Sequence, residues 1–175
     1  EAPVGTPLCA FMQAAFPNPA VPVIGALVNG ELEELSYPVT RDVDVTPVDI
    51  ASNDGMLIYQ RSISLLLVAA VHELFPGTRV IIDHAVALGG FFCEIVGRSP
   101  FTEEELEAIE TRMRQIVADD EPIRKECIAM EEARAIFAAQ GYDDKVRLLA
   151  DCSQEEIPIY NLRGVRDYFY GYMMP

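Results

Sequence analysis

A long apolar segment near the middle of the chain constrains the fold more than any other feature. Residues 56–75 contain neither proline nor glycine, and Pro76-Gly77 follows them directly. This pattern predicts a long helix that ends at Phe75, because proline and glycine terminate helices. Its middle, Leu65 to Val71, is apolar on all sides, so we expect the helix to be buried against a sheet. The apolar run is much shorter than the ~20 residues that span a bilayer, and we therefore expect no membrane partner.

The rest of the chain carries both strand and helix signals, which predicts an α+β fold. Asn29-Gly30 is its strongest short hairpin signal. Thr6 is a candidate N-cap, and Thr102 with Glu105 forms a capping box. The capping box predicts a helix that buries the stripe Leu106, Ile109, Met113 and Ile116. The expected strands lie in residues 23–29, 31–37, 42–48, 78–83, 91–96, 123–130 and 157–172, and further helices span 7–15, 131–140 and 144–150.

The net charge excludes several classes of partner. The chain has 175 residues, with 13 lysines and arginines against 28 aspartates and glutamates, for a net charge of -15. Its two lysines are Lys125 and Lys145. Such a surface repels phosphate backbones and anionic membranes, so we expect no nucleic-acid partner. The four cysteines are widely spaced and form no CxxC motif, which indicates free thiols in a reducing, cytoplasmic environment.

Turn-forming residues divide the chain. The cluster from Ala51 to Gly55 predicts a boundary between a domain at residues 1–52 and a domain at residues 53–175. The chain starts at Glu1 and ends on apolar residues up to Pro175, from which we expect a fragment of a longer polypeptide.

The order of several motifs resembles a known family. One motif resembles the second additional domain of threonyl-tRNA synthetase by its spacing: Glu132-Ala133-Arg134, Phe137, Gly141 and Lys145-Val146. A helix that ends in Phe75-Pro76 before a Gly-Phe-Phe strand is similar to the same domain. The first ~50 residues resemble a TGS domain, a β-grasp module that precedes it, without the strands expected before Gly5. The resemblance implies a truncated β-grasp module followed by an editing-domain-like sheet-and-helix domain.

The same two modules resemble the region ahead of the kinase domain in uridine kinase-like nucleoside kinases, related to phosphoribulokinase. The motifs that carry this likeness are Tyr59-x-Arg61-Ser62, Glu73-Leu74-Phe75-Pro76, His84 with Gly90-x-Phe92-Cys93-Glu94, and Asp167-Tyr168-Phe169-Tyr170-Gly171. The chain has no Gly-Lys dipeptide and hence no P-loop. This resemblance implies a kinase domain beyond Pro175 as the partner, with ATP and Mg²⁺ bound there and no cofactor in this chain.

The editing chemistry of the family is missing at the matching positions. The family places His-x-x-x-His on the long helix and Cys-x-x-x-His near the end, where imidazole and thiol can bind metal or deprotonate water. The corresponding residues here are Leu65, Ala69, Leu162 and Arg166. Only Lys145 matches a position that contributes to editing. We therefore interpret the site as degenerate, with no catalytic residue and no metal.

Weaker candidates remain. His84 and Cys93 flank a glycine loop and could meet across a hairpin as a Cys-His pair, although a buried thiol beside a loop histidine is the simpler reading. We expect His72 at a helix C-terminus, where the helix dipole favours a cation. We expect the acidic runs at helix ends and turns, and their spacing is not that of a calcium-binding loop. The tail aromatics Tyr160, Tyr168, Phe169, Tyr170 and Tyr172 fit packing better than base stacking.

These observations lead to two hypotheses. The first is a non-catalytic accessory or regulatory region of a nucleoside kinase, which could bind a small molecule or nucleotide. The alternative is a proofreading-type hydrolase of mischarged tRNA from a threonyl-tRNA synthetase relative, with a site rebuilt around Lys145, His84 and Cys93.

Overall fold

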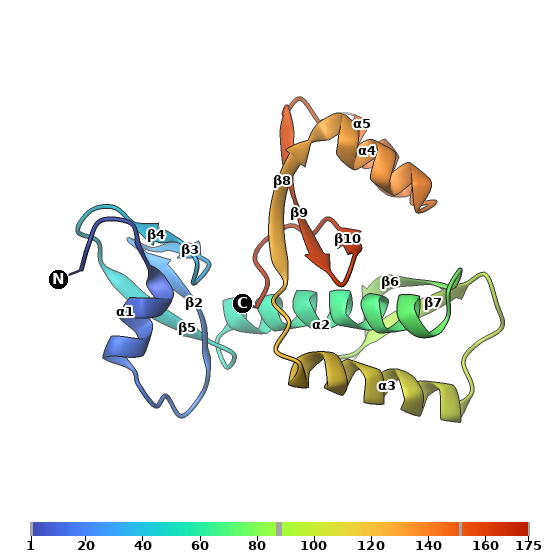
Figure 1. The fold of residues 1–175 in the computed structure, drawn as a ribbon, viewed down its shortest axis with the longest axis horizontal. Coiled ribbons are helices and arrows are strands. Elements are labelled where there is room, and N and C mark those ends of the chain that lie inside the picture. The colour runs from blue at the N-terminus through green and yellow to red at the C-terminus, as the bar shows by residue number, and fades with distance from the viewer. Residues whose placement is uncertain (1, 87–88, 151, 175) are drawn as a thin grey trace. The chain divides into compact units, whose positions relative to one another are not determined.

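The computed structural model describes residues 2–86, 89–150 and 152–174, and its fold is α+β, as predicted. The terminal residues Glu1 and Pro175 lie outside the described residues. The chain forms two compact units (Figure 1): unit 1 comprises residues 1–63 and 170–175, and unit 2 comprises residues 64–169. The division falls inside the long helix, whereas the sequence placed it before the helix. The assignment of residues 1–52 and 53–175 to two homologous modules stays a prediction.

Unit 1 is built on a small antiparallel sheet in the order β3-β2-β5. Its elements are β1 (Thr6–Pro7), α1 (Leu8–Ala15), β2 (Val23–Val28), β3 (Glu31–Glu33), β4 (Pro38–Val39) and β5 (Val45–Asp49). The predicted Asn29-Gly30 hairpin joins β2 to β3, with φ values of 52° and 88° that suit asparagine and glycine. Leu8, Ala26 and Val28 form the buried core of this unit.

Two local predictions in unit 1 are wrong. Thr6 does not cap α1: its hydroxyl donates to the Pro3 carbonyl at 2.7 Å, and Pro7 is the N-cap residue. The strand expected over 31–37 ends at Glu33, because the chain then turns and the Tyr37 amide donates to the Glu34 carbonyl at 2.9 Å.

The predicted long helix is α2 (Asn53–Leu74). It starts three residues earlier than expected, since the Ser52 hydroxyl accepts from the Gly55 amide at 3.1 Å and caps the first turn. Leu65, Ala69 and Ala70 are fully buried, as predicted for an all-apolar stretch. By length and hydropathy α2 could cross a membrane, which the short apolar run did not suggest. Core helices of globular proteins meet the same criteria, and the burial of these residues within protein is typical of such a helix.

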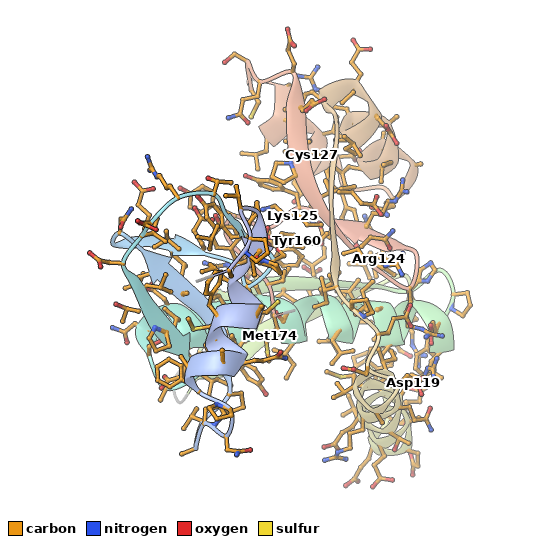
Figure 2. The ribbon with its side chains drawn as sticks, turned by 60° about the vertical axis from the view of Figure 1, so that its left-hand side comes forward. Asp119, Arg124, Lys125, Cys127, Tyr160 and Met174 are labelled. Atoms are coloured by element: carbon orange, nitrogen blue, oxygen red, sulfur yellow. The ribbon has the colours of Figure 1, made fainter. Side chains whose placement is uncertain are left out.

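The remaining elements form unit 2. They are β6 (Arg79–Ala85), β7 (Phe91–Val96), α3 (Glu103–Ala118), β8 (Arg124–Ala129), α4 (Met130–Ala139), α5 (Asp143–Ala150), β9 (Glu156–Leu162) and β10 (Val165–Asp167). β6 and β7 form an antiparallel pair, and β8, β9 and β10 form an antiparallel sheet in the order β10-β9-β8. In that sheet Lys125 of β8 is the register partner of Tyr160 of β9, and the two lie side by side in Figure 2. Helices α4 and α5 pack on the sheet through a core that includes Phe137, Leu149 and Ile159.

Helix α3 confirms the capping box. Thr102 accepts from the Glu105 amide at 3.3 Å, and the Glu105 carboxylate accepts from the Thr102 amide at 2.9 Å. The predicted stripe is partly wrong: Ile109 and Ile116 are buried, but Leu106 is 54% exposed.

Ion pairs connect α2 to α3 and to the β9–β10 turn. Glu73 of α2 accepts from Arg112 of α3 at 2.6 Å and also from Arg163 in the turn. Arg163 in turn donates to Glu121 at 2.6 Å. The bond from Arg112, followed by that from Arg163, holds the pKa of Glu73 below its ordinary value.

Candidate ligand pocket around Lys145

A cavity of about 510 Å³ in unit 2 contains the one residue that the sequence matched to editing. Its walls come from β6, from the turn between α4 and α5, from the first residues of α5 and from the end of β10. We call it the Lys145 pocket. Its charged lining residues are Arg79, Asp143, Asp144, Lys145, Arg147 and Asp167.

Lys145 is held in place by a carboxylate and by aromatic rings. Its ammonium group forms an ion pair with Asp167, whose side chain is only 9% exposed, and lies 4.4 Å from the centre of the Tyr142 ring. The same Asp167 oxygen accepts from the Tyr168 amide at 2.7 Å. A lysine used in this way is a structural and electrostatic group, because its charge is needed to keep a buried carboxylate paired.

The Tyr142 ring is in contact with two cations. Arg79 is placed 5.6 Å from the centre of its ring, and Lys145 is the second cation. Burial, reinforced by the nearby Asp167 charge, raises the pKa of Tyr142, so the phenol stays protonated at neutral pH. Tyr142 can donate a hydrogen bond but cannot serve as a base.

Arg79 is positioned by the glycine that ends α4. Its guanidinium donates to the Gly141 carbonyl, and a Cβ at Gly141 would lie 3.1 Å from Arg79 Nη1. Gly141 has φ +75°, the left-handed conformation usual for a helix-ending glycine. Sequence reasoning identified Gly141 as a helix end but missed Arg79, Tyr142 and Asp167 as pocket residues.

The positions matched to the family's metal-binding cluster carry no such chemistry. Leu65 and Ala69 are fully buried and Leu162 is 2% exposed, so three of the four are hydrocarbon in the core. The fourth, Arg166, forms ion pairs with Glu126 at 3.3 Å and Glu132 at 3.9 Å. Across the part of the chain that the structure describes, no group of three histidine, cysteine or acidic residues could hold a metal ion.

The second candidate pair does not form a nucleophile and base in contact. His84 Nδ1 lies 2.9 Å from Asp83 Oδ2, and its ring stacks on Phe92 with centroids 5.4 Å apart. The Cys93 thiol instead donates to the Phe91 carbonyl at 3.9 Å, and burial raises its pKa, which disfavours the reactive thiolate. A role for this pair in chemistry stays a prediction without support from its geometry.

Two of the other minor candidates, Tyr168 and Phe169, line the Lys145 pocket. His72 is exposed in the last turn of α2. Among the aromatic residues, Tyr160 is buried in the sheet, Tyr168 packs against the core and Tyr170 is 87% exposed.

Comparison with known proteins finds threonine–tRNA ligases among the relatives of this chain. No family model matches the chain. Threonine–tRNA ligases of Burkholderia lata and Nitrosococcus oceani are each 32% identical over 160 residues, which are 91% of this chain and 25% of those proteins. The threonine–tRNA ligase of Anaplasma marginale is 33% identical over 148 residues, or 84% of this chain and 23% of that protein. The chain thus spans about a quarter of the length of the curated relatives it matches.

These matches support the resemblance to threonyl-tRNA synthetase and the editing-domain-like fold. They give no support to the resemblance to nucleoside kinases.

Proposed function

We propose that this chain is a relative of the threonyl-tRNA synthetase proofreading region that no longer hydrolyses aminoacyl-tRNA and instead works as a ligand-binding accessory module. The observation that carries the proposal is the burial of Leu65, Ala69 and Leu162 as hydrocarbon at the positions where hydrolysis needs imidazole and thiol. Hydrocarbon side chains can neither bind metal nor move a proton.

The Lys145 pocket supports a binding role. It has charged groups, an aromatic ring and apolar walls from Val68, Val80 and Ile82, which is a usual composition for a small-molecule site. Its lysine is engaged with Asp167 and its tyrosine is kept protonated, so neither group is set up as a general base. The pocket therefore offers groups for recognition, and neither Lys145 nor Tyr142 is set up to activate water.

The proposal also concerns the class of longer protein to which this module belongs. The curated relatives favour a threonyl-tRNA synthetase relative over a nucleoside kinase. One observation keeps the kinase as a second candidate, because two of the motifs behind that resemblance meet in unit 1. Arg61 donates to the Tyr172 carbonyl at 3.4 Å, and a Cβ on Gly171 would lie 2.7 Å from the Arg61 guanidinium carbon.

If the kinase candidate is right, ATP and Mg²⁺ bind a separate domain that transfers the γ-phosphate to a nucleoside. The coding sequence downstream of Pro175 distinguishes the two: a P-loop supports the kinase, and synthetase class-defining motifs support the relative of threonyl-tRNA synthetase. In either case we propose a cytoplasmic protein.

Hydrolysis is the direct test of the accessory role. The chain is incubated with tRNA carrying a radiolabelled non-cognate amino acid, beside an editing-competent threonyl-tRNA synthetase as positive control. We expect release of the amino acid at the rate seen in buffer. Release above that rate, abolished by Lys145→Met, would overturn the proposal. An anisotropy titration should also give no submicromolar affinity for tRNA near ~0.15 M salt, because the net charge of -15 opposes binding.

A further inference from the structure

The three-stranded sheet of unit 2 ends on one side at β8, which pairs with β9 alone among the described residues (Figure 1). The β8–β9 register is unbroken over all six residues of β8, from Arg124 opposite Asn161 to Ala129 opposite Glu156. The register of β2 with β5 and that of β6 with β7 each contain a shift. The outer side of β8 is therefore a regular open edge, which is a template for a further strand.

The register also shows which main-chain groups face the open side. The Met130 amide donates to the Glu155 carbonyl at 2.9 Å, and these two residues continue the β8–β9 register by one pair. Hydrogen-bonded and non-hydrogen-bonded pairs alternate along an antiparallel ladder, so the even-numbered residues of β8 bond to β9 and the odd-numbered residues face outward. Pro158 lies opposite Cys127 and agrees with this phase, because proline has no amide to donate to β8. Cys127, the middle odd-numbered residue, thus directs its amide and carbonyl to the open edge.

The two ends of β8 carry opposite charge. Arg124 and Lys125 begin the strand. Glu131 lies just beyond its end, in the first turn of α4, and Glu156 lies opposite its last residue. Arg124, Glu131 and Glu156 are exposed, and none of them forms an ion pair within the part of the chain that the structure describes. A partner strand with charge of one sign would match only one end, whereas an antiparallel second copy of β8 presents the complementary charge to both.

We infer that β8 is a dimerisation edge, at which the β8 strands of two copies of this chain pair antiparallel with Cys127 on the two-fold axis. The two Cys127 residues lie opposite each other and exchange their main-chain hydrogen bonds. The two three-stranded sheets then continue as one sheet across the axis. Arg124 of each protomer is brought to the acidic end of its partner, where Glu131 supplies the opposite charge.

Charge also selects this register over its neighbours. A two-fold axis at Lys125 would place the lysines of the two protomers opposite each other, and an axis at Glu126 would do the same with the glutamates. Like charges directly opposite each other are unfavourable in an antiparallel pair. With the axis at Cys127, Lys125 of one protomer instead lies opposite Ala129 of its partner, which is uncharged and exposed.

The test uses the 175-residue chain in ~0.15 M salt. Sedimentation equilibrium at chain concentrations up to about 1 mM should show a reversible monomer–dimer equilibrium. A short bismaleimide should then join two copies through Cys127 and not through Cys152, which is also exposed. Peptide mass spectrometry identifies the joined residues. The covalent link should persist in Cys152→Ser and be absent from Cys127→Ser.

The variant Cys127→Pro tests the strand pairing itself. It removes an amide that faces outward, so the β8–β9 hydrogen bonds remain, and the dimer should be at least about tenfold weaker. Cys127→Ser keeps the amide and is the control, with an expected affinity equal to that of the parent. A thermal melt checks that each variant is folded.

If Cys127→Pro is unfolded, the variant Arg124→Glu decides. It places like charges together at both ends of the paired strands and should weaken the dimer at least about threefold. Adding Glu131→Arg to this variant should restore the affinity, because the opposite charges then meet again. Arg114→Glu makes the same charge change at an exposed position of α3 and should leave the dimer unchanged.

A chain that stays monomeric up to about 1 mM would overturn the inference and leave the edge to a strand of another protein. The same conclusion follows if a folded Cys127→Pro dimerises as tightly as the parent, or if the bismaleimide joins other cysteines instead. An Arg124→Glu variant no weaker than Arg114→Glu would also contradict it. The proposed accessory function is tested separately by hydrolysis of aminoacyl-tRNA, and neither result depends on the other.

Discussion

Lys145 of α5 donates to the Oδ1 atom of Asp167 on β10, and this contact connects the helical layer of unit 2 to the edge of its sheet. Among the described residues, Lys145→Met would leave the Asp167 carboxylate with the Tyr168 amide as its hydrogen-bond donor. Because an under-satisfied buried carboxylate is unfavourable, we expect a loss of about 1–3 kcal/mol in the free energy of unfolding.

A double-mutant cycle in denaturant checks this. Lys145→Met/Asp167→Leu removes both charges together and should be less destabilised than the sum of the two single variants. Additive losses would mean that the two residues are not energetically coupled.

Leu65 supplies a test of the degenerate site. It is fully buried, so Leu65→Ala should cost about 2–5 kcal/mol through lost transfer energy and the cavity that remains. Leu106→Ala is the matched control: Leu106 is 54% exposed, and its truncation should cost about 0.5 kcal/mol or less. Urea melts measure both, and a midpoint for Leu65→Ala equal to that of the parent would place Leu65 at an open cleft instead of in the core.

The ion pairs of Glu73 predict a pH dependence of stability. The pKa of this carboxyl is lowered in the folded chain, first by Arg112. Its contribution is therefore fully present above the unfolded value of about 4.3 and is lost as the pH falls through the folded pKa. Glu73→Gln should be less stable than the parent at neutral pH, and this difference should shrink under acid.

Denaturant melts between neutral pH and pH ~3 measure the difference, with the exposed Glu107→Gln of α3 as control. A stability difference for Glu73→Gln that stays constant over this range would show that the ion pairs contribute nothing to folding.

Metal content is a fourth test. With Leu65, Ala69, Leu162 and Arg166 at the four positions, we expect no stoichiometric zinc in the purified chain. Elemental analysis after mild chelation measures this, and about one zinc per chain would contradict it.

Local sequence signals predicted local structure well. The Thr102–Glu105 capping box and the Asn29-Gly30 hairpin are confirmed because each is determined by residues a few positions apart. The all-apolar run around Leu65 is likewise buried as predicted. Leu106 was assigned to the buried stripe because of its helical spacing, and its exposure depends on which neighbours cover α3, which spacing does not encode.

The pocket was less predictable. Lys145 was identified through a resemblance, but its partner Asp167 is 22 residues away and Arg79 lies 62 residues before Gly141. Neither contact has a short-range pattern. The first arises when the fold brings α5 to β10, and the second when it brings β6 to the turn between α4 and α5.

The final residues of the chain have a consequence for folding. Tyr170–Pro175 belong to unit 1, where the Met174 amide donates to the Ser62 hydroxyl at 2.8 Å and Met173 is buried. The chain therefore leaves unit 1 after residue 63 and returns to it at residue 170, and these two ends are held together by contacts within unit 1. A folded unit 1 thus closes the segment 64–169 into a loop even when that segment is unfolded. Closing a chain at both ends reduces the conformational entropy of its unfolded state, which stabilises unit 2 without adding a single contact inside it.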